Sequence, residues 1–190
     1  MGNGKYDNEY FIQQGFIPLK DYLYPNDWVC NFGASHTLEY AFSCYAAAQM
    51  AKAIGKTAAY DTLMQYSYAY KNLFDPETKY MRPREMDGSF MKDFDPLKGW
   101  KGFQEGNAAQ YTWYVPHDTQ GLTELMGIDL FNERLENTFI ESRKTLFGGG
   151  KEIDSFSGVE KLYNQGNQPC LHDAWLFNYS GKHLFQPPFQ

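Results

Sequence analysis

The sequence is poor in cysteine and contains no long apolar run. Its three cysteines are Cys30, Cys44 and Cys170, in a chain of 190 residues. Because their number is odd and their spacing is wide, we expect buried or idle thiols rather than a disulfide framework or a zinc site. No apolar run approaches the roughly 20 residues of a membrane-spanning helix. The N-terminus does not read as a signal peptide either, so we expect no membrane partner.

Positive charge is also scarce. The chain has 17 Lys and Arg against 23 Asp and Glu, which gives a net charge of -6. A nucleic-acid-binding protein usually carries a basic stripe, and none is visible here. There is no Gly-x-Ser-x-Gly nucleophile elbow. The glycine run at 148–150 is interpreted as a flexible loop, because no Lys-Ser or Lys-Thr pair follows it as in a phosphate-binding loop.

Aromatic residues, by contrast, are abundant. They make up 18% of the chain, and apolar residues as a whole make up 43%. This composition excludes a disordered chain and predicts a globular domain with a substantial core. Most of the rings are expected to fill that core, Trp113 among them. Some could instead pack against the C–H faces of sugars.

The pattern of apolar residues predicts a mainly α-helical chain. Glycine or proline lies near the end of several segments, Thr57 and Asp118 are suitable N-caps, and Pro169 favours a first helical turn. One non-helical excursion is expected, a β-hairpin of 80–84 and 89–94 around the Asp87-Gly88 turn. We interpret 1–190 as a single domain of antiparallel helical hairpins. The predicted helices cover 35–54, 57–74, 107–114, 118–127, 130–145 and 169–178.

The densest group of chemically capable residues lies around Glu105, between aromatic residues and just ahead of a predicted helix. Burial of a carboxyl group raises its pKa, as a general acid for glycoside cleavage requires near neutral pH. Gly106 would allow a close approach of the backbone to a ligand. The alternative is that Glu105 only stabilises the helix N-terminus. His117 and Asp118 follow closely, and a structural histidine beside a helix cap is the alternative for that pair.

A second group spans 165–173. Amide and backbone oxygens at Asn167 and Gln168 could ligate calcium, which prefers oxygen ligands, or they could bind sugar hydroxyls. An ordinary asparagine cap ahead of Pro169 is the alternative. Elsewhere, Trp100 is a possible stacking ring. Glu39, in the first long predicted helix, requires a partner if it is buried.

These segments together resemble glycoside hydrolase family 92, the calcium-dependent exo-acting α-mannosidases. The resemblance extends from about 35 to 184, and the Glu-Gly-Asn segment with its Val-Pro-His-Asp continuation is its most specific part. The matching segments are Thr-Leu-Glu-Tyr-Ala at 37–41, the stretches 70–78 and 81–84, Gly-Phe-Gln-Glu-Gly-Asn at 102–107, Val-Pro-His-Asp at 115–118, 121–127, Gly-Asn-Gln-Pro at 166–169 and 176–181.

The resemblance implies an N-terminal β-sandwich domain followed by an (α/α)6 barrel, with this chain as the middle of the barrel. Both ends of the chain read as cut, so we expect a fragment that lacks the β-sandwich and the end of the barrel. The family inverts the anomeric configuration, and its acid corresponds to Glu105. Calcium is the implied cofactor, with Asn167 and Gln168 as ligands. Mannose-containing glycans are the implied partners, and a periplasmic or secreted location is implied. The implied substrate-binding residues are Trp100, Phe103, His117, Asp118, Gln168 and His172.

The chain departs from the family pattern at two places. Gln168 stands where the family usually has glutamate, so we expect weaker metal binding or a changed sugar preference. The segment ending in Gly-Gln-Met-Ser, which carries the family's base, is absent from the sequence. We therefore expect a fragment of an α-mannosidase, with α-1,2-linked mannose as its substrate, that is inactive on its own.

Three alternatives remain at this point: a glycan-binding helical module, an inactive truncation product, and a different α/α-barrel glycosidase. Apolar faces left exposed by a missing part of the barrel would promote self-association.

Overall fold

A computed structural model describes residues 7–20, 32–144 and 156–182, and within these ranges the chain is mainly helical. Its only β-pairing there consists of isolated bridges. None of the described helices has the length and apolar content needed to cross a membrane. The helices are α1 Asn8–Gln14, α2 Gly33–Ala53, α3 Thr57–Ser67, η2 Tyr68–Asn72, α4 Ala108–Tyr111, α5 Thr119–Met126, α6 Ile128–Lys144, η4 Gln168–Cys170 and η5 Asp173–Tyr179, where η denotes a 3-10 helix.

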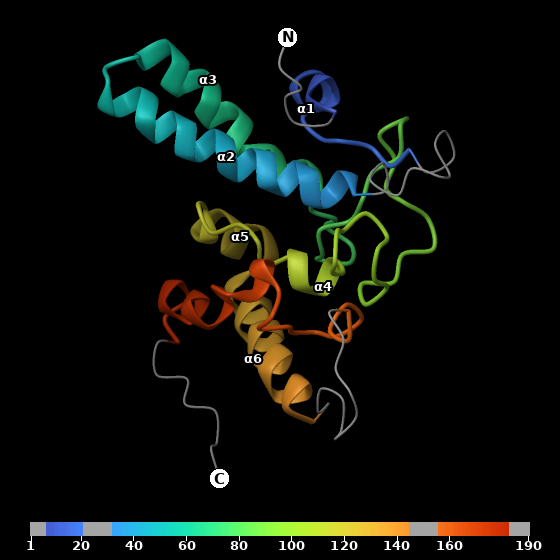
Figure 1. Cartoon of the computed structure of the whole chain (residues 1–190). Helices are drawn as coiled ribbons and strands as arrows, with labels where there is room; N and C mark the ends of the chain where they lie inside the picture. The colour runs from blue at the N-terminus through green and yellow to red at the C-terminus, as the bar shows by residue number, and fades with distance from the viewer. Residues whose placement is uncertain (1–6, 21–31, 145–155, 183–190) are drawn as a thin grey trace.

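Helices α2 and α3 form an antiparallel hairpin (Figure 1). Gly55 turns the chain between them with a left-handed φ of 72°, which glycine adopts without steric cost. Both helices lie within two residues of their predicted starts. The prediction of Thr57 as N-cap is wrong, because Lys56 occupies that position and makes no side-chain capping bond. The chain then tightens into η2, so the predicted α-helix to 74 ends early.

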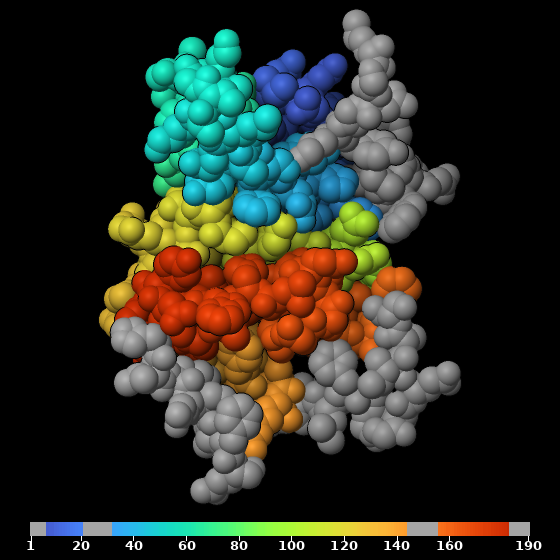
Figure 2. All heavy atoms as spheres, turned by 60° about the vertical axis from the view of Figure 1, so that its left-hand side comes forward, coloured from blue at the N-terminus to red at the C-terminus, as the bar shows by residue number. Residues whose placement is uncertain are grey.

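The second half of the chain contains the shorter helices and α6. Asp118 caps α5 as predicted, since its carboxylate accepts a hydrogen bond from the Gly121 amide at 3.1 Å. Helix α4 is only four residues long, and two 3-10 helices replace the single helix predicted from 169. Figure 2 shows 156–182 as a continuous band across one face of the molecule. Cys30, Thr145 and the glycine run at 148–150 lie outside the described residues.

The non-helical excursion lies between η2 and α4. Its turn is at Asp87-Gly88 as predicted, with Asp87 accepting hydrogen bonds from the Ser89 amide at 2.9 Å and hydroxyl at 2.7 Å. An antiparallel bridge joins Arg84 to Phe90, and the Met91 amide donates to the Pro83 carbonyl at 2.8 Å. Among the described residues the pairing stops at isolated bridges, so the two strands predicted on either side of the turn do not form a ladder.

The main core lies where α2, η2, α4, α5, α6 and η5 meet. Trp113 lies at its centre, with its ring edge against Phe131 at a centroid distance of 5.3 Å. This confirms the core alternative for Trp113, whose ring is 1% exposed. The core fixes the position of α4, and with it the position of the loop that precedes α4. Other fully buried members are Leu38, Tyr70, Leu73, Met81, Phe103, Leu122 and Leu135.

Candidate active site

The Glu105 loop, residues 99–107, turns sharply just before α4. Trp100, Gly102 and Glu105 all have positive φ values, at 65°, 83° and 55°. The Trp100 amide closes the loop by donating to the Gly106 carbonyl at 3.1 Å. A side chain at Gly102 would collide with Pro83, so both its φ and its surroundings require glycine. The loop is therefore a specific, tightly folded structure.

Helix α2 and helix α4 hold this loop from two sides. The Ser35 amide donates to the Gly102 carbonyl at 3.1 Å, and the Ser35 hydroxyl accepts from the Gln104 amide at 3.1 Å. The Tyr111 hydroxyl donates to the Gln104 carbonyl at 2.8 Å. The peptide groups just ahead of Glu105 are thus fixed by side chains from both helices.

Asn167 fixes the loop from the C-terminal segment. Its side-chain amide donates to the Glu105 carbonyl at 2.7 Å, across 62 residues of sequence, and the residue is 6% exposed. Asn167 occupies the N-cap position of η4 but makes no side-chain capping bond there. The cap alternative is therefore wrong. The predicted group at 165–173 therefore contacts the predicted group around Glu105 through this hydrogen bond.

The Glu105 side chain itself is exposed. The prediction of a carboxyl group buried among aromatic rings is therefore wrong in this chain. Phe103 points into the core, 1% exposed, with its ring 5.3 Å from that of Tyr111. Because the Phe103 ring is buried, the structure does not support its predicted substrate-binding role. Trp100 is half-buried, with its ring 5.9 Å from that of Phe32 and 5.3 Å from that of Phe156.

His117 and Asp118 lie at the junction of α2, η2 and α5. A ring nitrogen of His117 pairs with the Ser67 carbonyl at 2.8 Å, and burial lowers the pKa of the ring. The second Asp118 oxygen accepts from the Tyr70 hydroxyl at 2.6 Å, while the first caps α5. Both Asp118 oxygens have partners within the fold, which supports the structural alternative for this residue, and the substrate-binding role of the pair stays a prediction.

His172 and Gln168 lie on the C-terminal band. A ring nitrogen of His172 pairs with the Trp113 carbonyl at 2.8 Å, and its ring meets the Tyr114 ring edge-on at 5.9 Å. Burial lowers the pKa of His172, so the ring is neutral near pH 7. Gln168 is exposed. Its substrate-binding role stays a prediction.

A calcium site at Asn167 and Gln168 also stays a prediction. In the described part of the chain no group of three or more His, Cys, Asp or Glu side chains is placed to hold a metal ion. Amide and backbone carbonyl oxygens do suit calcium, which takes about six to eight oxygen ligands. The donor chemistry of this pair fits the ion, but two side chains supply only part of such a shell.

Two residues near the loop were given no site role by the sequence analysis. They are Glu39 of α2 and Tyr114, which lies three residues after the end of α4. Burial raises the pKa of Tyr114, and the charge of Glu39 raises it further. The spacing of Ser35, Glu39 and Phe42 could have indicated the role of Glu39 from the sequence, because it places the three side chains on one face of α2.

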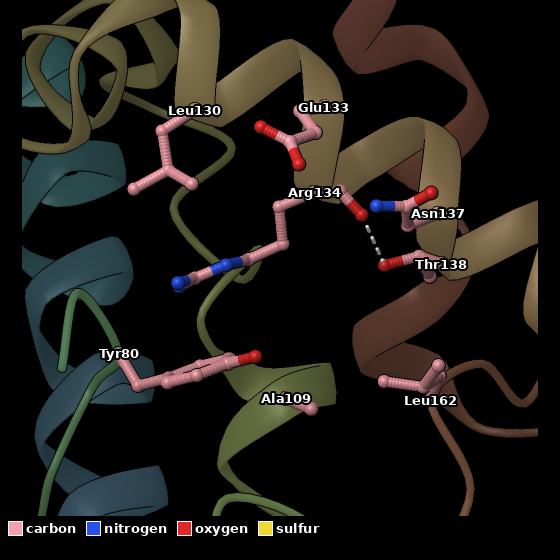
Figure 3. Close-up of a pocket in the computed structure, with 8 residues that line it drawn as sticks. All are labelled: Tyr80, Ala109, Leu130, Glu133, Arg134, Asn137, Thr138 and Leu162. Atoms are coloured by element: carbon pink, nitrogen blue, oxygen red, sulfur yellow. Dashed lines mark hydrogen bonds between the residues drawn. The ribbon is translucent and has the colours of Figure 1, made fainter.

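A separate pocket of about 210 Å³ lies against α6, and its lining includes none of the predicted site residues (Figure 3). The Arg134 guanidinium stacks on the Tyr80 ring at 3.9 Å and donates to the carbonyls of Thr78 and Lys79. Because Ala109 of α4 is one of the lining residues, the pocket lies beside α4. The lining residues are Tyr80, Ala109, Leu130, Glu133, Arg134, Asn137, Thr138 and Leu162.

The described residues thus form a mainly helical layer in which the Glu105 carboxyl group is exposed on a loop held by α2, α4 and Asn167. The chain belongs to glycosyl hydrolase family 92, because the model of that family's catalytic domain matches residues 2–184. None of the curated proteins matches the chain.

Solved structures agree with this family. The family GH92 α-mannosidase BT3965 from Bacteroides thetaiotaomicron is 35% identical, with a TM-score of 0.76 over 95% of this chain and 22% of its own. Its complex with mannoimidazole gives a TM-score of 0.77 at 34% identity over 95% of this chain and 23% of its own. The inverting mannosidase BT2199 from the same organism is 29% identical, with a TM-score of 0.71 over 90% of this chain and 23% of its own. The chain therefore spans less than a quarter of the length of these relatives.

Proposed function

We propose that this chain is a catalytic-domain segment of an inverting exo-α-mannosidase, built into an (α/α)6 toroid. The observation that supports this most directly is the support of the Glu105 loop. Ser35, Tyr111 and Asn167 fix its backbone from three separate segments, while the Glu105 carboxyl group stays exposed. Such support suits a group that has to meet a substrate in one orientation.

In this proposal Glu105 is the general acid. It gives its proton to the glycosidic oxygen as the bond to the anomeric carbon breaks, which lets the departing sugar leave as a neutral alcohol. Inversion requires a second carboxyl group about 6.5–9.5 Å away, with room between the two for the attacking water. The Gly-Gln-Met-Ser segment that accompanies the family's base is absent from these 190 residues. The base is therefore proposed to come from another part of a longer polypeptide.

Calcium is proposed as the cofactor, held in part by oxygens of Asn167 and Gln168. When bound, it would grip two neighbouring hydroxyls of the sugar. Asn167 has a second task that needs no metal, because its amide fixes the Glu105 carbonyl. The proposed substrates are mannose-containing glycans with terminal α-1,2-linked mannose, acted on in the periplasm or outside the cell. The mannoimidazole complex of the relative BT3965 supports the sugar class.

The test uses a chimera in which residues 2–184 replace the matched segment of BT3965. The chimera is expected to hydrolyse an α-mannose disaccharide, and Glu105→Gln is expected to lower kcat about 10²- to 10⁴-fold, the usual contribution of a general acid. The matched control is Glu77→Gln, since Glu77 is exposed and lies in the turn after η2. A disaccharide is used because activated aryl leaving groups need little protonation.

Two outcomes would contradict the proposal. One is a Glu105→Gln chimera as active as the Glu77→Gln control. The other is a folded, unsubstituted chimera that neither binds mannoimidazole nor cleaves the disaccharide. The 190-residue chain alone is expected to show no turnover, because it lacks the proposed base.

A further inference from the structure

One face of α2 points toward the segment that carries the candidate acid. Ser35, Glu39 and Phe42 are spaced by four and three residues, so their side chains share one face of the helix. Ser35 contacts the Gln104 amide at 3.1 Å. Phe42, at the other end, meets the Tyr114 ring at 6.3 Å. Glu39 lies between these two contacts and therefore faces the stretch from 104 to 114.

The surroundings of Glu39 confirm this direction. Burial raises the pKa of Tyr114, and the charge of Glu39 raises it further. Burial also raises the pKa of Tyr111, and the charges of Glu39 and Glu105 both add to this rise. The hydroxyl groups of Tyr111 and Ser35 both contact the backbone of Gln104, the residue before Glu105, at 2.8 and 3.1 Å.

Glu39 is half-buried, and no ion pair between described residues includes it. A carboxylate has about four lone-pair sites. A partly buried carboxylate with unused acceptor sites costs free energy unless donors reach it. The two tyrosines that its charge influences, Tyr111 and Tyr114, carry neutral hydroxyl groups, so the site suits a neutral ligand rich in hydroxyls.

We propose that Glu39 is a substrate-binding residue that accepts hydrogen bonds from hydroxyl groups of the sugar whose glycosidic bond Glu105 protonates. This rests on the proposed function. In the same proposal Tyr114 is a positioning residue, whose hydroxyl orients the Glu39 carboxylate. The Tyr114 ring is itself held between Phe42 and His172, at 6.3 and 5.9 Å. The ligand class is a neutral pyranose with free hydroxyls.

The experiment compares Glu39→Gln, Tyr114→Phe and Glu77→Gln in the chimera with BT3965. Replacing the carboxylate by an amide removes its charge and one of its two acceptor oxygens. Glu39→Gln is therefore expected to raise KM for the disaccharide, and Kd for mannoimidazole, about 10- to 100-fold, as expected for loss of hydrogen bonds to a charged group. Tyr114→Phe is expected to shift both constants in the same direction but less. Glu77→Gln is expected to change neither.

Each remaining outcome overturns the proposal. Unchanged KM and Kd in a folded Glu39→Gln chimera would show that no sugar hydroxyl binds there. A lower melting temperature with unchanged KM and Kd would assign Glu39 a structural role. A higher calcium requirement would assign it to a metal shell. Failure of the proposed function looks different, because there Glu105→Gln retains kcat, or the unsubstituted chimera is inactive.

Discussion

Asp173 is a fully buried carboxyl group at the start of η5. A ring nitrogen of His172 lies 3.9 Å away, and neither Asp173 oxygen has a well-formed hydrogen bond to a described residue. Burial raises the pKa of Asp173 well above its usual value. The folded chain therefore keeps this proton at pH values where the unfolded chain, with an aspartate pKa of about 3.9, has lost it. Ionisation of Asp173 opposes folding, so its contribution to stability falls as the pH rises above about 4.

The substitution Asp173→Asn isolates this effect, because asparagine has a similar shape and no charge to desolvate. The free energy of unfolding in urea is to be measured for both chains at pH 4, 6 and 8. Asp173→Asn is expected to gain stability relative to the unsubstituted chain as the pH rises. His36 and His117 are present in both chains, so their titration cancels in the difference, whereas His172 lies 3.9 Å from Asp173 and contributes to it. A difference that stays constant with pH would contradict the prediction.

At the same scale, the sequence predicted local roles well and long-range roles poorly. The cap by Asp118 was predictable because its partner, Gly121, lies three residues away. Its bond to Tyr70 spans 48 residues and leaves no local signal. Likewise nothing in the residues around Asn167 indicates that its amide reaches the carbonyl of Glu105. Phe103 stands next to a predicted site, yet only the fold decides that its ring enters the core.

At the scale of the elements, periodicity predicted where the long helices lie but not how they end. Helices α5 and α6 have apolar stripes, whereas α2 carries apolar residues around most of its circumference. The bounds of all three fall within two residues of the prediction at every described end. The segments that become 3-10 helices, η2 and η5, carry similar stripes. Their tighter winding is imposed by packing, which the pattern does not contain. The Asp87-Gly88 turn was predictable because an Asp-Gly pair readily adopts the backbone angles of a tight turn. The number of paired residues on either side of it depends instead on the neighbouring segments.

The attachment of 158–161 to α4 offers an element-scale prediction. The Asn107 amide donates to the carbonyls of Val159 and Lys161 at 2.8 and 2.9 Å, and its oxygen caps α4 through the Gln110 amide. The Gln110 side chain adds bonds to Gly158 and Lys161. Asn107→Ala removes three buried hydrogen bonds of about 1 kcal/mol each, so we expect destabilisation of about 2–4 kcal/mol.

Urea unfolding measures this loss, and amide hydrogen exchange shows where it acts. Exchange is expected to speed up at 158–161 and in α4 and to stay unchanged in α3, which does not contact Asn107. The matched control is Asn137→Ala, because Asn137 is an exposed asparagine in α6. Equal effects of the two substitutions, or faster exchange spread evenly over the chain, would count against the attachment.

At the scale of the whole molecule, the chain covers 22% of BT3965, and in the proposed toroid a segment of that size would leave faces that the rest of the toroid covers. The described structure has an exposed apolar face on the C-terminal band. Leu171, Trp175 and Tyr179 are 54%, 69% and 63% exposed there. Exposed apolar side chains gathered on one segment are typical of a surface that binds another protein surface. We therefore predict that the 190-residue chain self-associates through η5.

Sedimentation velocity at about 5 to 100 µM tests this, because hydrophobic association grows with concentration. The unsubstituted chain is expected to shift toward dimers and larger species over this range. Trp175→Ser combined with Tyr179→Ser is expected to keep the chain monomeric, since the two rings bury about 150–250 Å² each on association. Met50→Ser, at an exposed position near the end of α2, is the control and is expected to associate like the unsubstituted chain. If Met50→Ser abolished association and the double substitution did not, the contact would lie on the α2–α3 hairpin, and the assignment to η5 would be wrong.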